Sequence, residues 1–235
     1  MIRDIFENHG ITITEEQEQK LNQYYDLLID WNNKINLTSI VEYEEVIWKH
    51  FLDSAFFVSC DKVDLKEKKK VLDLGTGAGF PGMVLAILCP DYEFVLADSL
   101  NKRIEFLKVV INRLQIHNVS VIHGRAEELG RDENFRNQFD YVVSRAVAEL
   151  PVLLEYCIPF VKKGGYFVSY KSRRLDEEIE NADNALNMLY TKYDKKYKYE
   201  LEYDHSERYL VFFRCENITD SKYPRKPKKI KTNPL

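Results

Sequence analysis

Residues 71–82 read VLDLGTGAGFPG, an apolar strand with an acid near its end, followed by glycines that alternate with small residues. A glycine turn lets the backbone lie directly against a ligand, and the helix expected after it would point unpaired N–H groups at the same place. The stretch also contains the dinucleotide pattern G-x-G-x-x-G at positions 77, 79 and 82, which is a weak signal by itself. It therefore predicts that a nucleotide-like ligand binds where this strand ends.

The acid within this stretch, Asp73, bears on which ligand binds. A carboxylate beside the glycine turn would repel a pyrophosphate, but it would attract the ammonium group of the methionine part of S-adenosylmethionine. We therefore expect S-adenosylmethionine as the cofactor, with a nicotinamide or flavin site as the alternative. The residues expected to hold its methionine end are Asp73, Gly75, Gly77 and Gly79.

A second acid, Asp98, ends the apolar strand predicted over residues 93–98. In doubly wound sheets an acid at this place binds ribose hydroxyls, so we expect Asp98 to hold the adenosine, with Ser99 beside it. The alternative is that Asp98 caps the helix predicted over residues 101–115, whose apolar residues recur at helical spacing. Ser99 could serve as that cap equally well.

The next two predicted strands are also followed by polar residues. After residues 119–122 come Ala126 and Glu127, where a backbone N–H and a carboxylate could meet the adenine, and after residues 139–143 comes Arg145. Ligands bind at this edge of open α/β sheets, at the carboxyl ends of the strands. The structural alternatives are a first-turn helix acid for Glu127 and a surface salt bridge for Arg145. Structural roles are expected for His50, Asp53 and His123.

The residues after the fourth strand also bear on the chemistry. Residues 144–146 are Ser-Arg-Ala, which is neither the Asn/Asp-Pro-Pro-aromatic motif of exocyclic-amine methyltransferases nor the Pro-Cys nucleophile of pyrimidine-carbon methyltransferases. A purine ring nitrogen has an exposed lone pair and needs no base, so an enzyme only has to hold it in line with the sulfonium methyl. We therefore expect Arg145 to position the base or a phosphate, and we expect no general base.

The chain before the glycine loop has the pattern of a helical cap. Amphipathic patterns over residues 14–31 and 42–59 predict two helices, the first of which opens with a capping box of Thr14 and Gln17. We therefore expect an N-terminal helical cap over residues 1–65.

Strand and helix patterns alternate after the cap, which is typical of βαβ units, and a fifth strand is predicted at residues 165–170. Residues 196–203 and 209–215 then predict an antiparallel hairpin at the edge of the sheet. A chain of 235 residues with 45% hydrophobic residues suits one α/β domain with a small extension. We expect the cofactor-binding domain to span residues 66–220.

Charge is distributed unevenly along the chain. Residues 1–60 hold eleven acids and four bases, whereas residues 222–235 hold six bases and no acid, within a formal net charge of −4. Pro224, Pro227 and Pro234 favour an extended chain over a helix in the basic tail, residues 221–235. Such an arm is typical of nucleic-acid binding, although a solvated terminus is the commoner explanation.

The four cysteines are scattered, with no C-x-x-C pair and no nearby histidine cluster. This pattern argues against a zinc site or disulfides and for a reducing cytosol. The N-terminus lacks the basic flank and apolar run of a signal peptide, and no stretch reaches the ~18 apolar residues of a membrane span. We therefore expect a cytoplasmic protein that has no metal and no membrane partner.

The ordered set of motifs resembles the RsmG proteins, also called glucose-inhibited division protein B, over nearly the whole chain. It implies a class I S-adenosylmethionine-dependent methyltransferase with a Rossmann-like seven-stranded sheet, which methylates N7 of a guanine in bacterial 16S ribosomal RNA. The motifs that carry the resemblance are the glycine loop, Trp31-Asn32 with Asn36-Leu37-Thr38, His50-Phe51-Leu52-Asp53-Ser54, Asp98-Ser99 with Lys102-Arg103, Gly124-Arg125-Ala126-Glu127, Ser144-Arg145-Ala146, and Tyr223-Pro224-Arg225 with the final Pro234-Leu235.

The resemblance also implies roles for individual residues. The cap and the tail would face the RNA, and the expected partner is 16S rRNA or the 30S subunit, bound by a monomer. A small-molecule methyltransferase, a nicotinamide-dependent oxidoreductase and a non-catalytic ribosome-assembly factor remain as alternatives. The residues that would line the cofactor site are Gly75, Phe80, Ala126, Glu127 and Arg145. The candidates for RNA binding are Lys102, Arg103, Arg125, Arg225, Lys226, Lys228 and Lys229.

Overall fold

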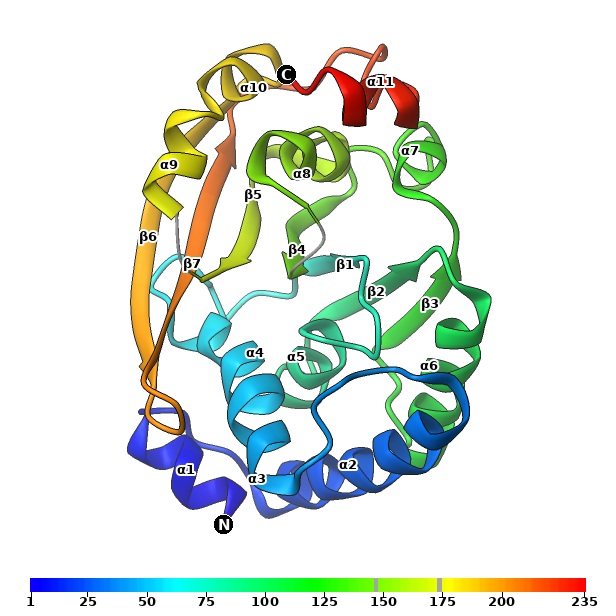
Figure 1. Cartoon of the computed structure of the whole chain (residues 1–235), viewed down its shortest axis with the longest axis vertical. Helices are drawn as coiled ribbons and strands as arrows, with labels where there is room; N and C mark the ends of the chain where they lie inside the picture. Colours follow the sequence, from blue (N-terminus) through cyan, green and yellow to red (C-terminus); the bar gives the residue numbers. More distant parts are fainter. Residues whose placement is uncertain (146–147, 173–174) are drawn as a thin grey trace.

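The computed structural model describes residues 1–145, 148–172 and 175–235. Ala146, the last residue of the Ser144-Arg145-Ala146 motif, lies outside the described residues. A seven-stranded sheet in the order β3-β2-β1-β4-β5-β7-β6 forms the centre of the molecule (Figure 1). The strands are β1 (Lys70–Leu74), β2 (Glu93–Asp98), β3 (Val119–His123), β4 (Phe139–Arg145), β5 (Val161–Lys171), β6 (Thr191–Leu201) and β7 (Ser206–Cys215).

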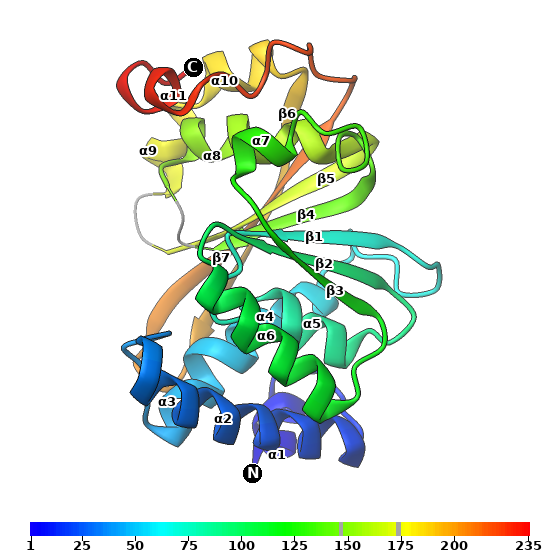
Figure 2. The same ribbon diagram turned by 90° about the vertical axis from the view of Figure 1, so that its right-hand side faces the viewer.

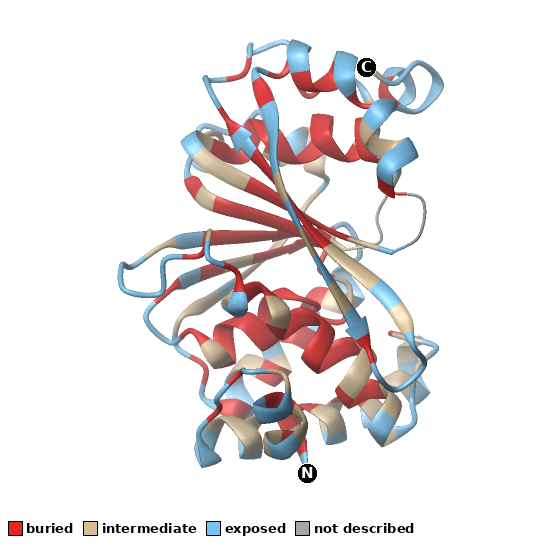
Figure 3. Ribbon diagram, turned by 90° about the vertical axis from the view of Figure 1, so that its left-hand side faces the viewer, coloured by how far each residue is buried: buried red, intermediate tan, exposed pale blue. Residues whose placement is uncertain are grey.

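The pairing of the strands confirms the predicted parallel sheet and its antiparallel hairpin. The first five strands run parallel, and β7 pairs antiparallel with both β5 and β6. Residues Val71 to Leu74 of β1 are all buried, as expected for a central strand covered on both faces (Figure 3). Because β2 and β4 leave β1 on opposite sides, the crevice between their carboxyl ends is the place where such sheets bind ligands.

Helices cover both faces of the sheet (Figure 2). One face is covered by α1 (Ile2–Asn8), α2 (Glu15–Ile35), α3 (Tyr43–Val46), the π-helical segment η1 (Ile47–Leu52), α4 (Asp53–Ala55), the 3-10 segment η2 (Phe56–Ser59), α5 (Gly82–Leu88) and α6 (Asn101–Leu114). The other face is covered by α7 (Ala126–Leu129), α8 (Leu150–Cys157), the 3-10 segment η3 (Ile158–Phe160), α9 (Leu175–Glu180), α10 (Asp183–Met188) and α11 (Pro227–Thr232).

The N-terminal cap contains the predicted capping box. The hydroxyl of Thr14 accepts from the backbone N–H of Gln17 at 3.2 Å, and the Gln17 side chain accepts from the Thr14 N–H at 2.9 Å. The Gln17 amide also donates to the carbonyls of Ile87 and Leu88 at the end of α5, so the start of α2 is joined to the sheet layer. Helix α1 was not predicted, because seven residues are too few to show a helical period.

The cap and the sheet share one hydrophobic core. Phe6 of α1, Tyr24 of α2 and Phe51 of η1 are fully buried in the same cluster as Leu96 of β2. The division of the chain at residue 65 into a cap and a cofactor-binding domain therefore stays a prediction. Cys60, Cys89, Cys157 and Cys215 are unpaired and buried.

The basic tail differs from its prediction. The expectation that prolines keep residues 221–235 extended is wrong for α11, because Pro227 occupies the first turn of this helix, where its missing N–H is not needed. The tail is also attached to the protein, since Ile230 is fully buried and Tyr223 is only 2% exposed. The physical reason is the burial of these two apolar side chains, which a solvated arm would leave in water.

Candidate functional site

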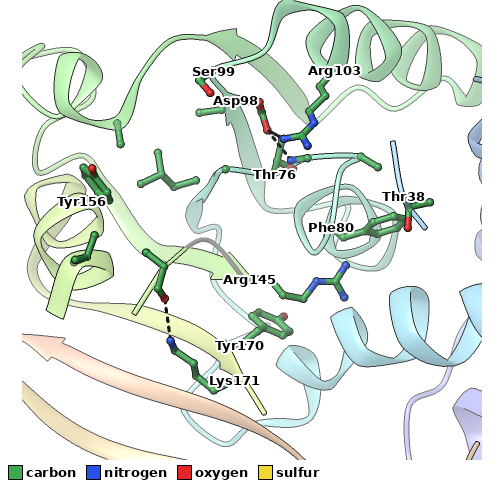
Figure 4. A pocket seen from close by; sticks show the side chains of 18 of the residues that line it. Thr38, Thr76, Phe80, Asp98, Ser99, Arg103, Arg145, Tyr156, Tyr170 and Lys171 are labelled. Carbon is green, nitrogen blue, oxygen red and sulfur yellow. Dashed lines mark hydrogen bonds and ion pairs between the residues drawn. The ribbon is translucent and has the colours of Figure 1, made fainter. Parts of the chain in front are cut away.

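A cavity of about 990 Å³ lies at the carboxyl ends of the central strands (Figure 4). Its lining includes residues that end or follow β1, β2, β4 and β5, together with residues of the cap, of β7 and of the basic tail. The volume is in the upper part of the roughly 300–1,000 Å³ range of small-molecule sites. The cavity is therefore large enough for a nucleoside cofactor and part of a second ligand.

The glycine loop forms one wall of the cavity. The backbone N–H groups of Gly75 and Thr76 both donate to the carbonyl of Ala97, at 2.9 and 3.1 Å, which fixes the loop against β2. Gly77 has φ +61°, and a Cβ built on it would meet no described atom within 4 Å. Gly77 therefore presents bare backbone to the cavity, and this arrangement fits the close approach of a ligand.

Gly79 is not among the described residues that line the cavity, and its predicted role at the cofactor stays a prediction. A Cβ at this residue, which has φ +100°, would collide with the Tyr24 hydroxyl and come within 2.9 Å of the Leu107 side chain. The Tyr24 hydroxyl donates to the carbonyl of Ala78, so α2 packs directly on the loop. Gly79 is thus a packing glycine that lets the cap approach the loop.

Asp73 lies beneath the glycine loop and is completely buried. Its Oδ2 accepts from the Thr76 hydroxyl at 2.6 Å and from the backbone N–H of Gly82 at 2.7 Å, while its Oδ1 has no partner among the described residues. Burial raises the pKa of this carboxyl to about 6. Asp73 therefore shapes the loop and is not among the described residues that line the cavity, and its direct contact with the cofactor stays a prediction.

Asp98 lines the cavity, and its contact with ribose hydroxyls stays a prediction. Its Oδ1 accepts from the N–H of Leu100 at 2.9 Å, but Leu100 is the N-cap residue of α6, so the alternative that Asp98 caps this helix is wrong. Its Oδ2 accepts from the Gly77 N–H at 2.9 Å and from Nη1 of Arg103 at 3.1 Å (Figure 4). Arg103 was predicted to bind RNA, but its guanidinium lies in this cavity because it pairs with the buried carboxylate. Ser99 lines the cavity and is exposed.

The predicted adenine-binding residues line the cavity at another end. Ala126 and Glu127 belong to the short helix α7, where Glu127 is a first-turn acid as its structural alternative expects, and its contact with adenine stays a prediction. Arg125 precedes them, lines the cavity and is exposed. Tyr156 of α8 lies at the same end (Figure 4).

Arg145 is the last residue of β4, lines the cavity, and contacts the cap. Its Nη1 donates to Oδ2 of Asp53 at 2.8 Å and to the carbonyl of Lys49 at 3.1 Å. The side chains of Arg145 and Asp53 are only 16% and 5% exposed, so this is a buried ion pair and the surface salt bridge considered from the sequence is wrong. The guanidinium also lies 5.3 Å from the centroid of the Phe80 ring, which lines the cavity.

His50 is held neutral beside Arg145. Burial and the positive charge of Arg145 lower the pKa of His50 from 6.5 to about 3. Nδ1 of His50 lies 3.3 Å from Nη2 of Arg145 and 3.2 Å from the carbonyl oxygen of Lys49, and Nε2 lies 3.0 Å from the Thr38 hydroxyl. The imidazole also stacks on Phe80 with the centroids 4.4 Å apart.

The cavity contains residues to which the sequence assigned no site role. Oδ1 of Asp53 accepts from the Tyr199 hydroxyl at 2.8 Å and lies 3.8 Å from Nε of Arg208. His50 and Asp53 are three residues apart, which places them on one helical face, and this spacing could have indicated a shared role. Arg208 lies on the edge strand β7, and no local signal connects it to the glycine loop. The lining residues in this group are Thr38, Lys49, His50, Asp53 and Arg208.

The remaining RNA-binding candidates fall into two groups. Arg225 forms a buried ion pair with Glu155, at 2.6 Å between Nη2 and Oε2, so its guanidinium is not free for RNA as predicted. The exposed candidates are Lys102, Arg125, Lys226, Lys228 and Lys229.

The described part of the chain contains neither a candidate metal site nor a candidate membrane span. Among these residues there is no group of three or more His, Cys, Asp or Glu side chains placed to hold a metal ion. No helix within the same residues is long and apolar enough to cross a membrane.

Comparisons with known proteins point to one family. The GidB family model, described as rRNA small subunit methyltransferase G, matches residues 17–204. The ribosomal RNA small subunit methyltransferase G of Lachnoclostridium phytofermentans is 50% identical over 216 residues, which cover 92% of this chain and 88% of that protein. The protein of the same name from Alkaliphilus metalliredigens is 46% identical over 228 residues, covering 97% of this chain and 94% of that protein.

The fold also matches that of a solved structure that is distant in sequence. M. jannaschii TYW2 in complex with AdoMet has a TM-score of 0.51 and 16% sequence identity, and the match covers 63% of this chain and 70% of that chain. This likeness and the strand order confirm the class I methyltransferase fold that the sequence predicts.

Proposed function

Because the chain belongs to the GidB family of rRNA small subunit methyltransferase G proteins, we propose that it transfers a methyl group from S-adenosylmethionine to N7 of a guanine in 16S rRNA, and that the transfer takes place in this cavity. The observation that carries this assignment is that the glycine loop and Arg145 line the same cavity, which brings a nucleoside site and a positioning residue together. The chain is an S-adenosylmethionine-dependent methyltransferase.

The residues on one side of the cavity fit the cofactor. Gly77 leaves open space where a Cβ would stand, and the Asp98 carboxylate beside it offers acceptors of the kind that ribose hydroxyls bind. When bound, S-adenosylmethionine supplies a methyl group on a cationic sulfur. We assign the methionine end to the loop of Gly75 and Gly77 with Phe80, and the adenosine to Asp98, Ser99, Ala126 and Glu127.

The residues on the other side fit the positioning of a guanine. The N7 lone pair requires no deprotonation, so the protein contributes orientation and not a base. His50 is unsuited to be a general base, since its pKa is about 3. Methylation leaves the guanine positively charged, and a bare arginine would repel that charge. The pairing of Arg145 with Asp53 offsets this repulsion while it keeps the guanidinium in place.

The exposed cations are the proposed contacts to RNA phosphate. Lys102 and Arg125 lie near the adenosine side of the cavity, and Lys226, Lys228 and Lys229 lie on α11 and just before it. We propose 16S rRNA or the assembled 30S subunit as the partner, bound by a monomer. The cytoplasmic location stays a prediction, and it agrees with a ribosomal substrate.

The decisive experiment compares 16S rRNA from a deletion strain with rRNA from the same strain that carries the gene. Mass spectrometry of nuclease fragments should show one N7-methylguanine lost on deletion and restored by the gene. If the gene for the Arg145→Ala variant restored the methyl group at the wild-type rate, Arg145 would have no role in the mechanism. Unchanged rRNA would instead favour a small-molecule methyltransferase or an assembly factor, and binding of NADH would favour an oxidoreductase.

In vitro, transfer of a labelled methyl group to naked 16S rRNA and to 30S subunits identifies the form of the substrate. Transfer to only one of the two preparations would settle which particle the enzyme recognises.

A further inference from the structure

The C-terminal segment, residues 221–235, is attached to the protein by a buried ion pair. Glu155 of α8 is fully buried, and it accepts from the backbone N–H of Arg225 at 2.8 Å. The Arg225 side chain binds the same carboxylate from two nitrogens, with Nε 2.8 Å from Oε1 and Nη2 2.6 Å from Oε2. A two-pronged, charge-assisted contact of this kind fixes both the position and the orientation of the segment.

Two arginines after α7 hold the start of the segment. Arg136 donates to the carbonyls of Thr219 and Tyr223, at 2.6 and 2.7 Å, and Arg131 donates to the carbonyl of Pro224 at 2.7 Å. These bonds satisfy backbone carbonyls that a mobile arm would leave to water. The segment therefore has a defined path over the surface, from β7 to α11.

Helix α11 lies beside α8 in both views (Figures 1 and 2). Ile230 is fully buried and belongs to the same apolar cluster as Leu153 and Leu154 of α8. As a result, Pro227, Lys231 and Pro234 line the large cavity together with Ala126, Glu127 and Tyr156.

We propose that the C-terminal segment is the outer wall of the adenosine end of the cofactor site, and that the Glu155–Arg225 pair locks this wall in place. Two proline rings and the aliphatic part of a lysine offer apolar surface to a purine ring, which suits a pocket that binds a flat nucleobase. The inference rests on the proposed function, because it takes the ligand of this cavity to be S-adenosylmethionine.

Removal of residues 221–235 distinguishes a wall of the cofactor site from a free RNA-binding arm. Deletion of a free arm would leave the affinity for the cofactor unchanged, whereas deletion of a wall would lower it. Deletion would open the adenosine end to water and leave the methionine end untouched. S-adenosylmethionine and 5′-methylthioadenosine, which lacks the amino-acid part, should therefore lose affinity by the same factor.

The experiment is calorimetric titration of both ligands into the full chain and into three variants, without RNA. The first variant ends after Asp220, and the second carries Lys231→Ser with Pro234→Gly, two exposed changes that leave the Glu155–Arg225 pair intact. The control is Lys222→Ser, an exposed lysine of the same segment that is not among the described residues lining the cavity. Thermal unfolding of each variant establishes that it is folded.

We expect truncation to weaken both ligands about tenfold or more and the double substitution to weaken both about threefold, since apolar contact area is lost in each case. The control should bind as the full chain does. Unchanged affinity in the folded double variant, or a loss confined to S-adenosylmethionine, would overturn the inference. A full chain that binds neither ligand would overturn the proposed function itself, so the two failures can be told apart.

Discussion

Nη1 of Arg145, at the end of β4, donates to Oδ2 of Asp53 in the N-terminal cap at 2.8 Å, across 92 residues of sequence. The same carboxylate accepts from Tyr199 of β6 through its other oxygen. Three distant parts of the chain thus meet at one carboxylate. We infer that Asp53 is a positioning residue, because its carboxylate holds the Arg145 guanidinium in place.

The first prediction concerns this pair. Arg145→Ala should leave cofactor affinity within a few fold and reduce turnover on RNA by about 100-fold, since a misplacement of about 1 Å can cost that much. Asp53→Asn should lower kcat in the same direction with KM for S-adenosylmethionine unchanged, because the asparagine still accepts from Tyr199 but no longer offers Arg145 a charge.

Steady-state kinetics with calorimetric binding checks this prediction. Asp30→Asn is a matched control, since Asp30 is an exposed carboxylate paired with Lys34 on α2. Partial recovery by Arg145→Lys is expected, as lysine keeps the charge and loses the fork of donors. Wild-type turnover in Asp53→Asn would show that Arg145 holds its place without the cap.

The second prediction compares two glycines of one loop. Gly77→Val should abolish S-adenosylmethionine binding in a folded protein, because the new side chain would fill space that faces the cavity. Gly79→Val should instead lower the melting temperature, because it drives against Tyr24 and Leu107. Both residues have positive φ, so backbone strain is common to the two variants. Any difference between their effects therefore comes from the atoms that surround each new side chain. Calorimetric binding and thermal unfolding distinguish the outcomes, and equal effects on both quantities would remove the distinction.

The third prediction follows from the neutral state of His50. Its pKa is about 3 in the folded protein and 6.5 in a free side chain, so between these values the unfolded chain binds a proton that the folded chain does not. The contribution to stability is therefore fully present above pH 6.5 and is lost as the pH falls toward 3.

The free energy of unfolding from urea titrations at pH 7.5, 6.0 and 5.0 checks the sign. The stability difference between the wild type and His50→Gln should shrink as the pH falls, by at most about 1.4 kcal/mol per pH unit, the limit for one proton. His117→Gln, at an exposed histidine, is the control. A constant difference for His50→Gln over this range would mean that the imidazole has the same pKa in the folded and unfolded chains.

The fourth prediction tests whether the lysines of the C-terminal segment bind RNA, with the proposed wall of the cofactor site left intact. Replacing Lys226, Lys228 and Lys229 together by Ala should weaken binding of 16S rRNA or the 30S subunit and leave S-adenosylmethionine affinity unchanged. Each phosphate contact contributes roughly 0.7–0.9 to the slope of log affinity against log salt, so three contacts should flatten the slope by about two. Salt series for both proteins give the slopes, and coincident slopes would move the RNA surface to Lys102 and Arg125.

Much of the fold was readable from the sequence because its signals are local. Residues 71–82 carry the strand, the glycine turn and the start of a helix within twelve positions, and each of these features follows from the backbone preferences of the residues themselves. The Thr14 and Gln17 capping box and the antiparallel hairpin were found for the same reason. Helix α11 was missed because proline content is a weaker guide than proline position.

The residues of the site can be divided in the same way, into those with a local sequence signal and those without one. The sequence by itself determined the ligand class and the place of residues that end a strand or come soon after one, such as Gly77, Asp98 and Arg145, since the carboxyl ends of parallel strands must meet at one edge. Only the tertiary structure decided that Gly79 packs on Tyr24, that Arg103 pairs with Asp98, that Asp53 holds Arg145, and that Arg225 locks the tail to Glu155. These contacts join residues whose partners are chosen by packing and by the need to pair a buried charge, and neither requirement leaves a mark in the neighbouring sequence.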